Sequence, residues 1–171
     1  MPRFPDPGPL GGEHLISGFD CGIRSLDVWL LDHARAAAGA GSARTYVVGD
    51  SQQQRVVGYH ALSVASIEPA ATTERARKGM PRHPIPVMLL ARLAVDDTVQ
   101  GMGIGAFLLR DAMTRAVSVA EQAGMRLLLV HAVNERARAF YEHFGFEASP
   151  TDAMNLQLPI KHIRLALDGT D

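Results

Sequence analysis

The positions of apolar side chains near the start of the chain predict a first helix. Apolar residues recur at intervals of three and four from Leu26 to Ala34. Because side chains three and four residues apart lie on one face of a helix, this spacing predicts an amphipathic helix. Ser25 is a residue type suited to the N-cap, and Gly39 and Gly41 are suited to end the helix.

The chain then changes to short apolar runs that are typical of strands. Residues 44–50 and 55–68 predict two strands, and the polar segment between them predicts an antiparallel hairpin. Residues 87–95 and 126–133 predict two further strands that are buried over most of their length. Residues 155–167 predict the last strand.

Two more helices are predicted between these strands. The longer one carries an apolar stripe from Ile104 to Ala116 and ends at Gly124. The shorter one covers residues 135–143, and residues 75–86 predict a loop or a short irregular helix. The order of elements is a helix, a hairpin, and then strand, helix, strand, helix and strand. This order predicts the α/β class, with a mixed sheet and helices on both of its faces.

Length and composition favour one domain of ordinary size. The chain has 171 residues, of which 47% are hydrophobic and 20% charged, which is enough for one core. Residues 1–12 contain four prolines and three glycines, so a flexible lead-in is expected there, with a single domain over 13–171. The start of the chain lacks the apolar core of a secretory signal. The longest apolar run is interrupted by Arg92 and is too short to cross a membrane.

The cysteine and histidine content limits the chemistry that is expected. Cys21 is the only cysteine, so no intrachain disulfide is expected, and a reducing cytoplasmic location fits. A catalytic thiol is conceivable at Cys21, but a small buried apolar side chain is the favoured interpretation. The seven histidines show no pair at the helical spacing of metal ligands, so no metal site is expected.

The segment 99–113 contains three alternating glycines followed by the long helical pattern. A Walker loop is excluded because no lysine follows the glycines. Gly101, Gly103 and Ala106 fit a dinucleotide fingerprint, but five residues separate the preceding strand from them, which disfavours a nicotinamide cofactor. Glycines allow a ligand to approach the backbone, and the N–H groups of a first helical turn attract phosphate. An ordinary tight turn is the alternative.

Two motifs resemble those of the GNAT superfamily of N-acetyltransferases. The first is [Q/R]-x-x-G-x-[G/A], with Gln100, Gly103 and Gly105 in place. The second is N-x-x-A-x-x-F-Y-x-x-x-G-F, which runs from Asn134 to Phe146. The resemblance covers nearly the whole chain. It implies the GNAT fold, with splayed central strands in the mixed sheet, and acetyl-CoA as the co-substrate.

The resemblance also implies a role for each motif. Tyr141 is expected to be the general acid that protonates the leaving thiolate, and a core aromatic is the alternative. Other residues are expected to bind the pyrophosphate and the pantetheine arm of acetyl-CoA. These residues are Leu93, Ala94, Val95, Gln100, Gly101, Met102, Gly103, Ile104, Gly105, Asn134 and Ala137.

The residues available as a base bear on the amine that is acetylated. The strand 87–95 contains no carboxylate, which leaves Glu68 or water as the base. A lysine amine with a pKa near 10.4 needs a base, whereas an α-amine at about 7.7–8.0 is already partly neutral. This difference favours an α-amine substrate.

A basic segment adds to this interpretation. Residues 74–92 contain five basic residues and one acidic residue. Several stretches between residues 19 and 96 are similar to the GNAT toxins of bacterial toxin–antitoxin pairs, which acetylate the α-amine of aminoacyl-tRNA and block translation. This resemblance implies a homodimer, a ribbon-helix-helix antitoxin as partner, and no membrane association. The residues expected to contact tRNA phosphates are Arg77, Lys78, Arg82 and Arg92.

Three alternatives remain open. The basic segment is compatible with a solvated loop that binds nothing. A GNAT N-acetyltransferase that acts on a small amine or a protein N-terminus is the second alternative. A domain that binds an antitoxin without catalysis is the third alternative.

Overall fold

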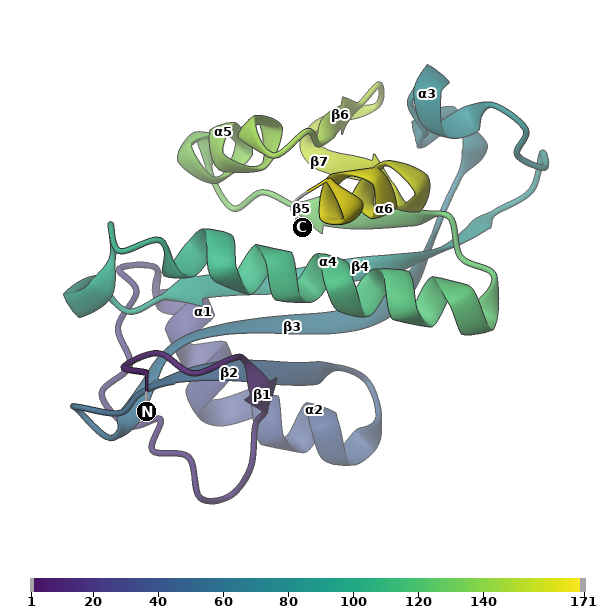
Figure 1. Cartoon of the computed structure of the whole chain (residues 1–171). Coiled ribbons are helices and arrows are strands. Elements are labelled where there is room, and N and C mark those ends of the chain that lie inside the picture. The colour runs from purple at the N-terminus through teal and green to yellow at the C-terminus, as the bar shows by residue number, and fades with distance from the viewer. Residues whose placement is uncertain (1, 170–171) are drawn as a thin grey trace. The chain divides into compact units, whose positions relative to one another are not determined.

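The computed structural model describes residues 2–169 and divides into two compact units (Figure 1). The first unit is Met1–Ser63 with Ala91–Ala112, and the second is Val64–Leu90 with Met113–Asp171. Residue 1, which begins the predicted span 1–12, lies outside the described residues. So do residues 170–171, which end the predicted span 13–171. The division into a flexible lead-in and one domain stays a prediction.

Within residues 2–169, seven strands are hydrogen-bonded in the order β1-β2-β3-β4-β5-β7-β6. β4 and β5 are parallel, whereas β1–β2, β2–β3, β5–β7 and β6–β7 are antiparallel. The predicted α/β class with a mixed sheet is therefore confirmed. The strands are β1 Gly8–Pro9, β2 Arg44–Asp50, β3 Arg55–Ile67, β4 Ile85–Val95, β5 Leu127–His131, β6 Glu147–Ser149 and β7 Asp152–Pro159.

The helices follow the predicted positions, with one addition at the end of the chain. The α-helices are α1 Arg24–Val28, α2 Ala34–Ala40, α3 Glu74–Arg77, α4 Ile104–Ala123, α5 Glu135–His143 and α6 Ile160–Asp168. A π-helical segment, Trp29–His33, joins α1 to α2. Short 3-10 turns occupy Pro69–Ala71 and Asp97–Val99.

The first helix begins earlier than predicted. Its N-cap is Ile23, whose carbonyl accepts the Leu26 N–H at 3.0 Å, so the prediction of Ser25 as N-cap was wrong. The preceding turn is instead held by Asp27, whose side chain accepts the Cys21 N–H at 2.8 Å. Gly41 ends the helix in the left-handed conformation at a φ of 74°, as predicted.

Helices cover both faces of the strands in the first unit (Figure 1). Leu30 in the π-helical segment packs with Val47 and Tyr59 in one buried cluster. Ile104 at the start of α4 packs in a second cluster with further side chains of β2 and β3. Successive strand residues point to opposite faces, so one pair of strands contributes to both clusters. The predicted arrangement of helices is confirmed here.

Gly58 on β3 allows α4 to approach the strand closely. A Cβ at Gly58 would lie 3.0 Å from Leu108 Cδ1 and 3.1 Å from Ile104 Cγ2. We therefore expect Gly58→Ala to lower the free energy of unfolding by about 1–2 kcal/mol through overpacking. Gly39→Ala is the matched control, because Gly39 is helical with nothing within 4 Å and alanine favours helix. Denaturant unfolding measures both, and an equal effect of the two changes would contradict the packing argument.

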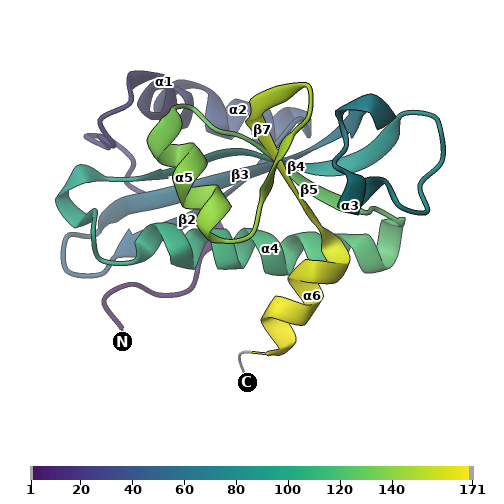
Figure 2. The same cartoon turned by 90° about the horizontal axis from the view of Figure 1, so that it is seen from above.

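The second unit shows that the last predicted element was wrong in its second half. Residues 155–167 are not one strand: β7 ends at Pro159 and α6 begins at Ile160 (Figure 2). Proline lacks the N–H that a strand ladder needs and is tolerated at a helix start. Ile160 and Ile163 are both buried, and their spacing of three residues fits a helix rather than a strand.

Short elements near the start of the chain lie within the predicted lead-in. Gly8 and Pro9 pair with Val47 and Tyr46 of β2 as strand β1. Arg3 Nη2 lies 3.0 Å from Asp50 Oδ2, in an ion pair whose carboxylate is fully buried. Two residues of strand pairing carry too little periodicity to be predicted from sequence.

Candidate functional site

The end of β4 carries three of the residues predicted to bind acetyl-CoA. The ladder of β4 with β5 joins Met88–Leu90 to Leu128–Val130. Leu93, Ala94 and Val95 lie beyond that ladder, so their backbone groups take no part in it. On the side of β4 that faces β5, backbone N–H and C=O groups beyond the ladder are available to a ligand that carries amides.

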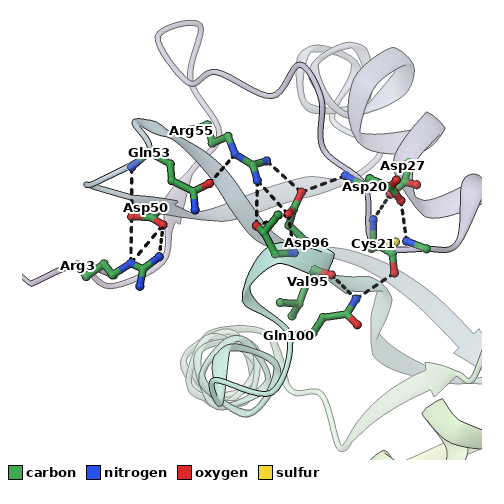
Figure 3. Close-up of polar contacts among 12 residues, drawn as sticks. Arg3, Asp20, Cys21, Asp27, Asp50, Gln53, Arg55, Val95, Asp96 and Gln100 are labelled. Atoms are coloured by element: carbon green, nitrogen blue, oxygen red, sulfur yellow. Dashed lines mark hydrogen bonds and ion pairs between the residues drawn. The ribbon is translucent and has the colours of Figure 1, made fainter.

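The turn after β4 is fixed by a buried carboxylate (Figure 3). Asp96 is 1% exposed, and Arg55 donates to both of its oxygens at 3.0 Å. The Thr98 hydroxyl donates at 2.6 Å and the Asp20 N–H at 3.1 Å. Burial alone raises the pKa of Asp96, but these hydrogen bonds outweigh it and hold the pKa below its ordinary value. Asp96 is therefore ionised at neutral pH.

Gln100 ties the glycine turn to the rest of the first unit (Figure 3). Its Nε2 donates to the Cys21 carbonyl at 3.0 Å and to the Val95 carbonyl at 2.9 Å. The structure thus gives this side chain two backbone partners of its own. Its predicted contact with the co-substrate stays a prediction, and its positioning of the turn was not foreseen.

The glycine turn presents bare backbone at the start of α4. Gly101 and Gly103 have φ values of 82° and 83°, a region that favours glycine. A Cβ at either position would meet nothing within 4 Å. Met102 is 51% exposed between them, and Ile104 is buried as the first residue of α4. The turn therefore leaves room over its backbone at the positive end of a 20-residue helix dipole.

We expect Gly103→Ala to raise the KM for acetyl-CoA about tenfold, because a methyl group would occupy the space where a phosphate approaches the backbone. Steady-state kinetics with acetyl-CoA as the varied substrate measures the change. Gly41→Ala is the matched control: Gly41 has a φ of 74° and nothing within 4 Å of its Cβ. It carries the same conformational strain in a different place. A similar KM for both variants would contradict a role of the turn in binding.

In the second unit, Asn134 caps the helix α5. Its backbone is extended, and its Oδ1 accepts the Ala137 N–H at 2.8 Å. The predicted helix 135–143 is confirmed with these bounds. The side chain of Asn134 is exposed and has its amide N–H groups left to donate. Ala137, one turn into α5, is half-buried.

Tyr141 lies on the same helix as a largely buried side chain. It is 5% exposed, and its ring makes edge contacts with Phe140 and Phe146 at centroid distances of 5.2 and 5.6 Å. Burial raises the pKa of Tyr141 above the ordinary phenol value. The phenol therefore stays protonated at neutral pH, which is the form that a proton donor needs.

The predicted phosphate-contacting residues do not share one environment. Arg92 belongs to the first unit, where its Cζ lies 4.4 Å from the centre of the Trp29 ring, and burial lowers its pKa. Arg77 donates to the Thr72 carbonyl at 2.9 Å. Arg82 is exposed, and Lys78 lines a cavity of the second unit.

Three further basic residues line that cavity and were missed in the sequence. They are Arg126, Lys161 and Arg164. The last two lie in the segment that was wrongly predicted to be a strand. The available signal was the i, i+3 spacing of Lys161 and Arg164 after a proline, which is typical of one side of a helix.

The remaining candidate groups show no feature of a catalytic or metal-binding site within the described residues. Burial, followed by the hydrogen bond with Asp27, raises the pKa of the Cys21 thiol to about 12, which makes it a poor nucleophile. Glu68 is exposed at the end of β3. Within residues 2–169 no cluster of three or more His, Cys, Asp or Glu side chains is placed to hold a metal ion. No helix of this part of the chain is long and apolar enough to cross a membrane.

Known proteins resemble this chain along most of its length. The family described as acetyltransferase (GNAT) domain matches residues 41–148. A tRNA-acetylating toxin of Mycobacterium tuberculosis is 46% identical over 164 residues, which cover 96% of this chain and 97% of the relative.

Two solved structures extend the likeness to the fold. AtaT complexed with acetyl-methionyl-tRNAfMet is 30% identical with a TM-score of 0.86, covering 94% of this chain and 98% of that one. A tyrosine-to-phenylalanine mutant of AtaT, bound to acetyl-CoA and the C-terminus of the antitoxin AtaR, is 28% identical with a TM-score of 0.83. It covers 97% of this chain and 99% of that one.

Proposed function

We propose a function for this chain on the basis of its family: the chain belongs to the GNAT acetyltransferases. It is proposed to be a toxin that transfers acetyl from acetyl-CoA to the α-amino group of aminoacyl-tRNA and so blocks translation. The observation that carries the proposal is the identity of 46% to a tRNA-acetylating toxin over 96% of the chain. That similarity extends well outside the family's common domain at residues 41–148.

The glycine turn and the end of β4 are proposed to hold acetyl-CoA. Backbone N–H groups from Gly101 to Gly105 bind the pyrophosphate at the helix start. Backbone groups of Leu93–Val95 bind the amides of the pantetheine arm, and Asn134 donates to the same arm. Ala137 is small enough to leave the arm a path. The open space over the backbone at Gly103, and the position of Leu93–Val95 beyond the ladder with β5, support this assignment.

The reaction is proposed to be direct attack of the amine on the thioester. The amine nitrogen forms a bond to the acetyl carbon, the bond from that carbon to sulfur breaks, and the nitrogen loses a proton. Tyr141 protonates the departing thiolate as general acid. Its burial-raised pKa keeps the proton in place until sulfur carries charge. The proton on the amine passes to water or to Glu68.

The substrate and partners follow from the same family. An α-amine is partly neutral at cellular pH, which suits a site whose central strand has no carboxylate. Lys78, Arg77, Arg82 and Arg92 are proposed to contact tRNA phosphates. The protein is proposed to act in the cytoplasm as a homodimer that a ribbon-helix-helix antitoxin neutralises, and solved structures of AtaT include the antitoxin AtaR.

Incubation with labelled acetyl-CoA and a mixture of charged tRNAs tests the proposal. The expected result is label on the amino acid of at least one aminoacyl-tRNA, together with growth arrest when the chain is induced in cells. Arrest that survives Tyr141→Phe would favour binding alone. Label on a small amine or a protein N-terminus, with none on tRNA, would overturn the substrate.

A further inference from the structure

The second unit contains a cavity whose lining is strongly basic. It has a volume of about 280 Å³ and lies among α3 and the loop after it, the start of β5, and the first turn of α6. The residues that line it, all within 2–169, include no aspartate or glutamate. Its five charged side chains are Arg75, Lys78, Arg126, Lys161 and Arg164.

Three of these side chains form neither an ion pair nor a side-chain hydrogen bond within the described part of the chain. Lys78, Lys161 and Arg164 form no ion pair with any residue of 2–169, and all three side chains are exposed. Arg75, by contrast, is held by Glu147 and donates to the Gly145 carbonyl at 3.1 Å. The unpaired cations are therefore available to an anion from solution.

The remaining cation and the helix start fix the geometry of the cavity. Arg126 donates to the Gly79 carbonyl at 3.0 Å and accepts the Ile160 N–H on its own carbonyl at 2.9 Å. These bonds join the loop after α3 to the first residue of α6. α6 has nine residues and Pro159 as its N-cap, and after the Ile160 N–H its first turn has no side-chain cap from residues 2–169. An uncapped helix start adds positive potential to the cations.

The pKa of a neighbouring histidine is lowered in part by two of these cations. Burial, followed by the charges of Arg75 and Lys161, lowers the pKa of His162, while Glu147 opposes this. His162 is half-buried next to Lys161 and does not line the cavity. Burial disfavours charge of either sign, but the repulsion from Arg75 and Lys161 that adds to the shift would favour an anion.

We infer that this cavity binds a backbone phosphate of the RNA substrate. Its guanidinium and ammonium groups and its helix start are groups of the kind that bind phosphate. Five cations without a lining carboxylate fit a polyanion better than the single carboxylate of a peptide end. The inference rests on the proposed function for the identity of the RNA.

A double change on α6 tests the inference. Lys161→Gln with Arg164→Gln removes two unpaired charges, and Arg24→Gln with Arg44→Gln removes two exposed charges from the first unit as the matched control. We expect the α6 variant to raise the KM for a mixture of charged tRNAs about tenfold. Its binding should lose about one unit of salt slope for each charge removed. The kcat and the KM for acetyl-CoA should stay unchanged, and so should both values in the control.

The possible results distinguish failure of the proposed function from failure of the inference about the cavity. If the unchanged protein acetylates no charged tRNA, the proposed function fails. If it does, and the α6 variant keeps the KM and salt slope of the control, the cavity binds no RNA phosphate and the inference is overturned. A variant that keeps tRNA binding but loses binding of a poly-glutamate peptide would overturn it too. Lys78→Gln should reproduce the effect from another element, and melting temperatures verify folding.

Discussion

Replacing Tyr141 by phenylalanine is expected to lower kcat about a hundredfold while the affinity for acetyl-CoA stays the same. The change removes only the hydroxyl, and loss of a positioned general acid costs a factor of this size. The ring contacts with Phe140 and Phe146 remain, so the fold of α5 is preserved. Steady-state kinetics gives kcat, and calorimetric titration with acetyl-CoA gives the affinity.

Two further measurements sharpen this expectation. Tyr46→Phe removes a hydroxyl from β2 and serves as the matched control, with kcat unchanged. Because burial raises the pKa of Tyr141, the phenol should stay protonated well above pH 10, the ordinary phenol value. No fall in kcat from loss of this proton is therefore expected below that pH. A kcat for Tyr141→Phe within twofold of the unchanged enzyme would remove Tyr141 from the mechanism.

Replacing Arg55 by methionine is expected to lower the free energy of unfolding by about 3 kcal/mol. Asp96 is 1% exposed, and Arg55 donates to both of its oxygens at 3.0 Å. Removing one partner of a buried pair leaves an uncompensated charge, which costs about 3–5 kcal/mol. The remaining bonds from Thr98 and Asp20 place the effect at the lower end. Denaturant unfolding measures the change.

The same variant should show an altered dependence on pH. The lowered pKa of Asp96 means that its carboxylate stabilises the fold above the unfolded pKa near 3.9, and that this stability is lost as pH falls through the folded pKa. Without Arg55 the folded pKa rises, so the deficit of the variant should shrink in acid. Arg138→Met, which removes an exposed ion pair with Glu142, should leave the free energy of unfolding almost unchanged. A deficit that grows toward pH 3 would contradict the assignment.

A double variant distinguishes the effect of an unpaired buried charge from the effect of a loosened turn. Arg55→Met with Asp96→Asn leaves no buried charge without a partner, so it should be more stable than the sum of the two single changes. It should still loosen the turn that precedes Gln100. We therefore expect the KM for acetyl-CoA to stay raised even where stability recovers.

The local pattern predicts most of the helices and strands, because the spacing of apolar side chains and the cap residues can be read directly from the sequence. The helix 135–143 has its predicted bounds since Asn134 is an N-cap residue type that directly precedes it. Residues 155–167 misled the prediction because alternating Leu156 and Leu158 continue into Ile160 and Ile163, and the proline between them was given too little weight. The signal that separates the strand from the helix is the change in the spacing of apolar residues at Pro159.

The candidate site is only partly visible in the sequence. The glycine turn and Tyr141 stand in motifs whose spacing can be read directly. The contacts of Gln100 with Cys21 and Val95 join residues up to 79 positions apart, and no local pattern encodes them. The basic cavity has the same origin, since Lys78 and Lys161 come together only through the docking of α6.

The N-cap bond of Asn134 restricts what a partner molecule can offer at this position. Its oxygen already accepts the Ala137 N–H at 2.8 Å, whereas both hydrogens of its NH₂ group remain to donate. A molecule that presents an acceptor, such as an amide carbonyl, is therefore favoured at this position over one that presents a donor. Asn134→Asp would keep an oxygen that accepts the Ala137 N–H but would replace the NH₂ donor with a second acceptor. The change would therefore alter recognition of the bound molecule while the start of the helix stays intact.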